Sequence, residues 1–268
     1  MPASRSPSRG AEPAARTRSH WPIVLIGIVA IAAAIVAALP ASIVAHFLPP
    51  AVTAEDFSGS LWHGSAGKIT LNARDAGALE WRLHPAALLG MTVSADLHWV
   101  KLGFVIDAAV KIDRQGIAAR DVKGGGPIED LNGLGVAAGW RGIADVHLDT
   151  LRTTFAQPLA AAGDIQVSNV TAAQVADGAD LGGYDLRFAQ GPAGADGNLT
   201  AQLADTGGPL EVQATIHYSA QERTATLGGT VRERPEAPPA LVRQLQGLSQ
   251  LRGRDAQGRI PFDLEFRL

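Results

Sequence analysis

At residues 93–112 the sequence reads VSADLHWVKLGFVIDAAVKI, and apolar residues recur there at every second position. The second half of the stretch contains six of them, namely Leu102, Phe104, Ile106, Ala108, Val110 and Ile112. A period of two puts side chains on one face of a β-strand, whereas a helix would spread them around its axis. The stretch therefore predicts two consecutive, half-buried strands that meet near Val100 and Lys101.

The same alternation recurs in four later stretches of the chain. They cover residues 144–148, 184–188, 210–218 and 260–268. Turn signals separate the alternating stretches, and they include Asp113-Arg114-Gln115-Gly116, Gly124-Gly125-Gly126 and Gly207-Gly208-Pro209. Because these signals come at short intervals, they favour antiparallel neighbours over the long crossovers that parallel strands need.

A few short helices are expected between the strands, at residues 85–89, 127–134 and 239–251. The last of them places four leucines on one side, Leu241, Leu245, Leu248 and Leu251. The 30 glycines and 16 prolines suit a chain that turns often and is built from short segments. We therefore predict one extended antiparallel β-sheet domain with a few short helices.

The N-terminal part of the chain has a different character. From residue 21 to residue 54 it contains no Asp, Glu, Lys or Arg. A bilayer core requires about 20 apolar residues in a helix, and residues 21–44 meet that length. The alternative is a cleaved signal peptide ending near Ala37, Ala38 or Ala41, but signal peptides usually have apolar cores of only about 7–15 residues. We therefore predict a retained transmembrane anchor at 21–44.

Charge predicts the orientation of this anchor. The preceding arm, residues 1–20, contains Arg5, Arg9, Arg16 and Arg18 against the single acid Glu12. Basic flanks stay in the cytoplasm, so the arm is expected inside and the remainder outside. The predicted organisation is a disordered cytoplasmic arm at 1–20, a transmembrane anchor at 21–44 and a periplasmic β-rich domain at 45–268. The fold class is mainly β.

Composition excludes several classes of function. The 23 basic and 26 acidic residues give a net charge of −3, which argues against a basic footprint for nucleic acid. The absence of cysteine excludes a disulfide framework and a thiolate metal site. No serine lies in a G-x-S-x-G nucleophile elbow, and Gly64-Ser65-Ala66-Gly67-Lys68-Ile69 lacks the spacing and the hydroxyl residue of a phosphate-binding loop.

One polar cluster has two interpretations. Asp145, His147 and Asp149 share one face of a predicted strand and could converge on a metal ion. Their neighbours Ala144, Val146 and Leu148 define an apolar opposite face, so the cluster also fits the solvated side of an ordinary strand. We favour the solvated strand, and we therefore predict no catalytic, cofactor-binding or metal-binding residues.

A family resemblance begins at Gly59-Ser60-Leu61-Trp62-His63-Gly64-Ser65-Ala66. It continues at Leu79-Glu80-Trp81-Arg82-Leu83-His84-Pro85-Ala86-Ala87-Leu88. These segments, in this order after an apolar anchor, resemble protein N of bacterial type II secretion systems. The resemblance covers nearly the whole chain after residue 20, and the longer arginine-bearing arm has no counterpart in it.

The resemblance implies a non-enzymatic accessory subunit of the machine that exports folded proteins from the periplasm. It implies a single-pass protein of the bacterial inner membrane with a cytoplasmic N-terminus and a periplasmic bulk. The implied partners are the inner membrane and other secretion subunits, either the secretin or the inner-membrane platform, with no cofactor and no nucleic acid.

Candidate contact residues for a partner are aromatic residues and one glycine: Trp62, Gly64, Trp81, Phe262 and Phe266. The tryptophans also suit core positions, which we favour for Trp62, Trp81 and Trp99. A terminal strand at 260–268 could recruit a partner by strand addition. Two alternatives remain, namely an apolar groove that handles lipid between membranes and an enzyme that uses Asp145, His147 and Asp149.

Overall fold

The computed structural model describes residues 38–154, 160–188, 198–219, 222 and 224–267. Leu39–Leu268 forms a compact unit distinct from Met1–Ala38. The predicted arm and most of the predicted anchor lie outside the described residues. Within the part of the chain that is described, no helix has the length and apolar character needed to cross a membrane.

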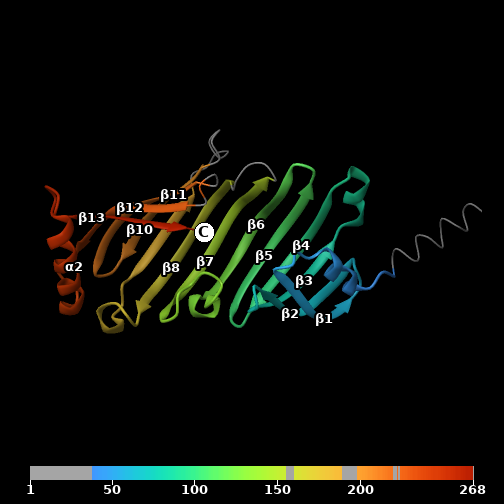
Figure 1. The fold of residues 1–268 in the computed structure, drawn as a ribbon, viewed down its shortest axis with the longest axis horizontal. Helices are drawn as coiled ribbons and strands as arrows, with labels where there is room; N and C mark the ends of the chain where they lie inside the picture. Colours follow the sequence, from blue (N-terminus) through green and yellow to red (C-terminus); the bar gives the residue numbers. More distant parts are fainter. Residues whose placement is uncertain (1–37, 155–159, 189–197, 220–221, 223, 268) are drawn as a thin grey trace, which may run out of the picture. The chain divides into compact units, whose positions relative to one another are not determined.

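Thirteen strands form one antiparallel sheet in these residues, and each strand pairs with the next one in the chain (Figure 1). The predicted mainly β, antiparallel fold is confirmed. The strands are β1 Val52–Gly59, β2 His63–Leu71, β3 Arg74–Leu83, β4 Val93–Lys101, β5 Phe104–Asp113, β6 Gly116–Pro127, β7 Trp140–Thr154, β8 Ala160–Ala172, β9 Gly183–Phe188, β10 Asn198–Gly207, β11 Leu210–Ser219, β12 Thr224–Glu233 and β13 Ile260–Arg267.

The register of the sheet gathers apolar side chains on one side, which we call the apolar face. A shift of one residue would turn a strand's whole apolar set to the other side, so each pairing must preserve the alternation. Apolar residues oppose each other across strand pairs along the sheet, for example Leu97 with Ala108, Val122 with Leu148, and Val212 with Val231.

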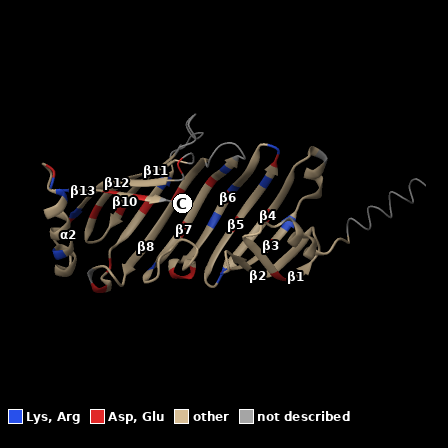
Figure 2. Ribbon diagram, viewed as in Figure 1, with Lys and Arg blue, Asp and Glu red and all other residues tan. Residues whose placement is uncertain are grey.

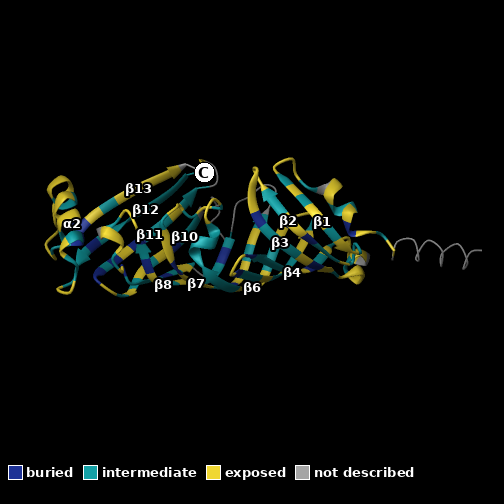
Figure 3. Ribbon diagram, turned by 90° about the horizontal axis from the view of Figure 1, so that it is seen from below, coloured by how far each residue is buried: buried dark blue, intermediate teal, exposed yellow. Residues whose placement is uncertain are grey.

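Different elements cover the apolar face at the two ends of the sheet. At the C-terminal end, α2 (Pro239–Arg252) connects β12 to β13 and lies beside them (Figure 3). It buries Leu241 and Leu245 against the strands. The resulting C-terminal core consists of Val170, Ala172, Leu181, Leu210, Val212, Val231, Leu241, Leu245 and Ile260.

At the N-terminal end, short 3₁₀ helices take the place of a long helix. They are η1 (Ala41–Phe47) and η2 (Pro85–Gly90). The buried residues of the N-terminal core are Ala41, Ala66 and Trp81. Ala41 is 1% exposed, although residues 41–44 had been predicted to end the membrane anchor. In the structure these four residues belong to η1, which contacts β1 and β2.

The predicted short helices have counterparts close to their expected positions. Two of them are η2 and α2. The third is shorter than predicted, because Pro127 ends β6, opposite Ile143, and η3 covers only Ile128–Leu131. One further 3₁₀ turn, η4 (Ala176–Gly178), follows β8.

Two leucines depart from the predicted pattern. Leu102 lies in the β4–β5 turn with a φ of 56° and is 77% exposed, so it is not the first apolar residue of a strand. Leu251 is 84% exposed. At about 100° per residue it lies roughly 80° away from the buried Leu241, so its side chain leaves the core-facing side of α2.

Candidate functional site

An apolar cavity of about 550 Å³ lies on the apolar face of β1–β5. Twenty residues from these strands, from η1 and η2 and from the loops beside them line the cavity. Two of them, His84 and Ser94, carry polar side chains other than a tryptophan N–H. The volume falls within the range of roughly 300–1,000 Å³ that is typical of ligand pockets. This cavity is the strongest candidate for a binding site in the described residues.

Trp81 belongs to the N-terminal core and also lines the cavity. Its side chain is 8% exposed, and its ring meets that of Phe57 edge to face, with centroids 6.4 Å apart and planes inclined at 71°. The indole Nε1–H donates to the carbonyl oxygen of Leu61 at 2.9 Å. Because its one polar atom is satisfied internally, Trp81 is a core anchor, as favoured from the sequence.

The glycines of the Gly-x-Leu-Trp-x-Gly segment have packing reasons. A Cβ on Gly64 would lie 2.7 Å from Cζ2 of Trp81 and 2.9 Å from Cβ of Ala41. Gly59 has a φ of +79°, and a Cβ there would lie 2.4 Å from the carbonyl oxygen of His63. The segment therefore forms a tight turn that lets Trp81 approach the backbone of β2.

The five candidate partner residues fall into two groups. Trp62 lines the cavity beside Trp81, and Gly64 pairs with Trp81 across β2 and β3. Phe262 and Phe266 lie on β13, at the other end of the strand order. Phe262 packs against the C-terminal core, whereas Phe266 is 48% exposed.

Sequence reasoning missed part of the cavity lining. Val44 of η1, Leu88 of η2 and Val93 of β4 all line it, and none of them was among the five candidate contact residues. The available signal was the apolar segment Pro85–Val93, where apolar residues lose the period of two next to an alternating strand. Such a change indicates apolar surface outside the strands.

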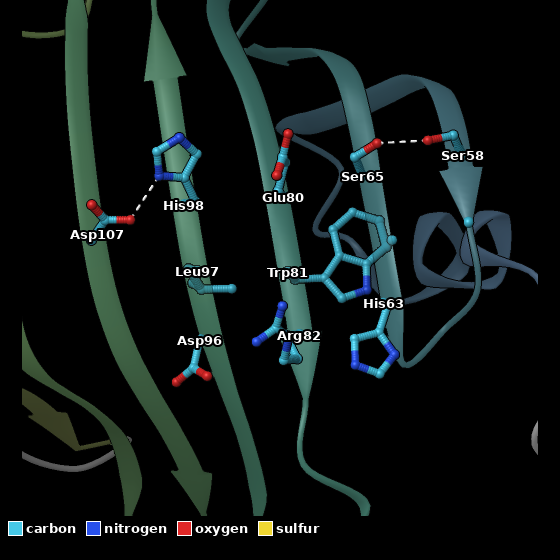
Figure 4. Close-up of a pocket in the computed structure, with 12 residues that line it drawn as sticks. Ser58, His63, Ser65, Glu80, Trp81, Arg82, Asp96, Leu97, His98 and Asp107 are labelled. Atoms are coloured by element: carbon cyan, nitrogen blue, oxygen red, sulfur yellow. Dashed lines mark hydrogen bonds and ion pairs between the residues drawn. The ribbon is translucent and has the colours of Figure 1, made fainter.

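The opposite face of β2–β5 carries a row of polar side chains beside a shallow hollow of about 420 Å³ (Figure 4). Register places Ser65, Glu80, His98 and Asp107 side by side on successive strands. His98 Nδ1 and Asp107 Oδ1 are 2.7 Å apart, and both side chains are exposed. Two strand spacings, roughly 10 Å, separate Ser65 from His98, so the row is no Ser-His-Asp triad.

The sequence cluster on β7 forms an exposed pair rather than a converging triad. His147 Nδ1 lies 2.9 Å from Asp145 Oδ1, and both side chains are more than half exposed. Asp149 falls where the β7–β8 register shifts, between Leu148 and Thr150. In the described ranges, no three His, Asp or Glu side chains are grouped so that they could hold a metal ion.

Charges of both signs are interspersed along the sheet (Figure 2). Partly buried ion pairs concentrate at the C-terminal end, where Arg234 Nη2 contacts Asp205 Oδ2 at 2.6 Å. Glu211 binds Arg232 and Arg259. The hydrogen bond from Arg232 is the main cause that lowers the pKa of Glu211.

Two further groups at this end have shifted pKa values. Arg254 donates to Glu233 at 2.7 Å, and this hydrogen bond is the main cause that lowers the pKa of Glu233. Burial raises the pKa of Tyr184 to about 12, with a further contribution from the charge of Asp205. The Tyr184 hydroxyl donates to the carbonyl oxygen of Leu181 at 3.0 Å, so it serves the fold of β8 and β9.

Comparison with known proteins gives one result. The family model described as Type II secretion system (T2SS), protein N, matches residues 50–263. Neither the comparison with curated proteins nor that with solved structures gives a match. The matched range runs from just before β1 into β13, so it covers nearly all of the sheet. The chain therefore belongs to the protein N family of the type II secretion system.

Proposed function

We propose that this protein is a non-enzymatic accessory subunit of the type II secretion system, held at the inner membrane. The observation that carries the proposal is the family match over nearly the whole sheet. In this proposal the apolar run that starts at residue 21 anchors the chain in a single pass and ends before η1, the N-terminal arm is cytoplasmic and the sheet lies in the periplasm. The anchor is supported by the 34-residue stretch from residue 21 to residue 54 without a charged side chain.

The proposed role is to hold another secretion subunit, the secretin or an inner-membrane platform protein. β13 supports this role because it pairs only with β12 and leaves its other edge open. An open edge presents unpaired N–H and C=O groups that a partner strand can use. Leu264 and Phe266 are each 48% exposed on this strand, so it offers apolar contact beside the backbone.

The test changes the edge and not the fold. In a strain lacking the gene, the full chain carrying Leu264→Lys places a charge on the apolar side of the edge strand, which opposes strand addition. Asp263→Lys is the matched control, because Asp263 lies on the opposite face of β13 and is exposed. Each variant is scored by the secretion subunits that copurify with it and by export of a folded substrate.

We expect Leu264→Lys to lose the copurifying subunits and to reduce export, while Asp263→Lys retains both. Protease resistance equal to that of the parent chain establishes that the sheet is intact. Unchanged copurification and export with Leu264→Lys would refute strand addition at β13.

A further inference from the structure

The cavity on β1–β5 is an unfilled part of a face that the chain itself fills elsewhere. Where β12 ends and β13 begins, the apolar face is covered by α2, whose Leu241 is 3% exposed and packs with Val231 and Ile260. Over β1–β5 the helices η1 and η2 only border the cavity. At its rim Leu88, Val93 and Ile112 are 47%, 39% and 39% exposed. The face at this end therefore has room for an occupant from outside the sheet.

Size decides between two kinds of occupant. One turn of an α-helix with its side chains fills a cylinder about 10 Å wide and 5.4 Å long, roughly 400 Å³. A cavity of about 550 Å³ therefore takes little more than one turn of a partner helix. A hydrocarbon chain is narrower and needs no hydrogen-bond partner along its length. The nearly uniform apolar lining of the cavity suits a hydrocarbon chain, because it offers few hydrogen-bonding groups.

A positive charge next to the cavity indicates what the hydrocarbon is attached to. Arg114 lies in the β5–β6 turn, two residues after the cavity-lining Ile112, and it lines a neighbouring hollow together with Met91 and Thr92. Its Nη2 contacts Met91 Sδ at 3.0 Å, and sulfur is a weak acceptor. The neighbouring Asp113 carboxylate instead accepts the backbone N–H groups of Gln115 and Gly116. Arg114 forms no ion pair with any carboxylate of the described residues, so its charge is available to a phosphate.

We propose that the cavity holds one acyl chain of a membrane phospholipid, with the headgroup phosphate beside Arg114. The choice of phospholipid as the acyl lipid rests on the proposed position at the inner membrane. The apolar lining of the cavity and the arginine in the hollow next to it do not depend on that position.

The experiment uses the full chain in bacterial cells. A photoreactive p-benzoylphenylalanine replaces Ile112, which lines the cavity, or Lys111, whose side chain lies on the opposite face of β5. After irradiation the protein is purified and covalent adducts are identified by mass spectrometry. We expect phospholipid adducts at position 112 and about tenfold fewer at position 111. A tenfold ratio corresponds to a difference of about 1.4 kcal/mol in binding free energy.

Two variants test the cavity and the arginine separately, each combined with the photoreactive residue at 112. Ala54→Phe projects a ring into the cavity from β1 and should remove the adduct. Arg114→Gln should lower the adduct yield about tenfold, as expected for loss of one charge-assisted hydrogen bond. Equal adducts at 111 and 112, a protein adduct in place of lipid at 112, or full yield with Ala54→Phe would each overturn the proposal.

The outcome is independent of the secretion assay. Lipid adducts in a chain that neither copurifies with secretion subunits nor supports export would refute the accessory role and retain the lipid site. Full copurification and export with no lipid adduct at 112 would refute the lipid site and retain the accessory role. A fatty acid adduct without phosphate would also refute the proposal, because it would remove the role of Arg114.

Discussion

The two ends of the apolar face are built from strands with the same alternation of apolar and polar residues, but different elements pack against them. At the C-terminal end Ile260 is completely buried and Ala172 is 0% exposed. At the N-terminal end more than a third of the surface of Leu88, Val93 and Ile112 is exposed to solvent. The difference teaches that strand alternation decides which face is apolar, whereas the connections between strands decide what covers it.

The reason for the difference lies in the connections. α2 has 14 residues and is joined to strands at both ends, so it can lie back across its own hairpin. The 3₁₀ helices at the other end have seven and six residues. Such short elements present one or two apolar side chains each and leave the cavity between them and the sheet.

The largest expected effect comes from opening the closed end. Ile260→Ala removes a fully buried side chain between α2 and β12, and truncations of this kind cost about 2–5 kcal/mol of unfolding free energy. Leu264→Ala on the same strand and face is the control, since Leu264 is 48% exposed and should cost far less. Urea denaturation of the full chain in detergent measures both. Equal losses would contradict the description of a closed core beneath α2.

One substitution made at both ends should give unlike results. Ala172→Leu overfills the C-terminal core and should destabilise the fold by about 1–3 kcal/mol. Ala95→Leu projects into the N-terminal cavity, where the added methyl groups have room, so we expect a change within about 0.5 kcal/mol. The same denaturation measurement compares the two. A loss at position 95 as large as that at 172 would mean that the cavity is filled by the chain itself.

Trp81 tests how rigid the open end is. Trp81→Phe keeps an aromatic ring and removes the N–H donor to Leu61, leaving that carbonyl unpaired at a cost of about 1–2 kcal/mol. Trp140→Phe is the surface control, because Trp140 is 36% exposed and should change stability by less than about 0.5 kcal/mol. Hydrogen exchange of β2 and β3 should speed up only in the Trp81 variant. Equal exchange in both variants would show that the hydrogen bond from Trp81 to Leu61 does not stabilise β2 and β3.

The sequence predicted the strands better than it predicted their surroundings. The alternation at 93–112 located β4 and β5 to within a residue or two, because side-chain period is a local property. The alternation could not show that Leu88 and Val44, 44 positions apart in the chain, border one cavity. The leucine spacing in α2 placed Leu241 and Leu245 correctly and failed at Leu251, which is 84% exposed because it lies on another side of the helix.

The smallest effect should be a response to acid at the C-terminal end. The folded-state pKa values of Glu211 and Glu233 are lowered, mainly by hydrogen bonds from Arg232 and Arg254. A lowered carboxylate pKa adds stability that is present above the unfolded pKa of about 4.3 and is lost as pH falls toward the folded pKa. We therefore expect the urea midpoint to fall as the pH drops below about 4.3.

The double variant Glu211→Gln, Glu233→Gln should lower the midpoint at neutral pH and flatten its dependence on acid. The effect is small because these pairs are partly exposed, so solvent screens them. Glu55→Gln is the matched control at the N-terminal end, where the Lys68 pair is more than half exposed on both sides. If the control flattens the acid response as much as the double variant does, the acid-sensitive charges are not those of the C-terminal end.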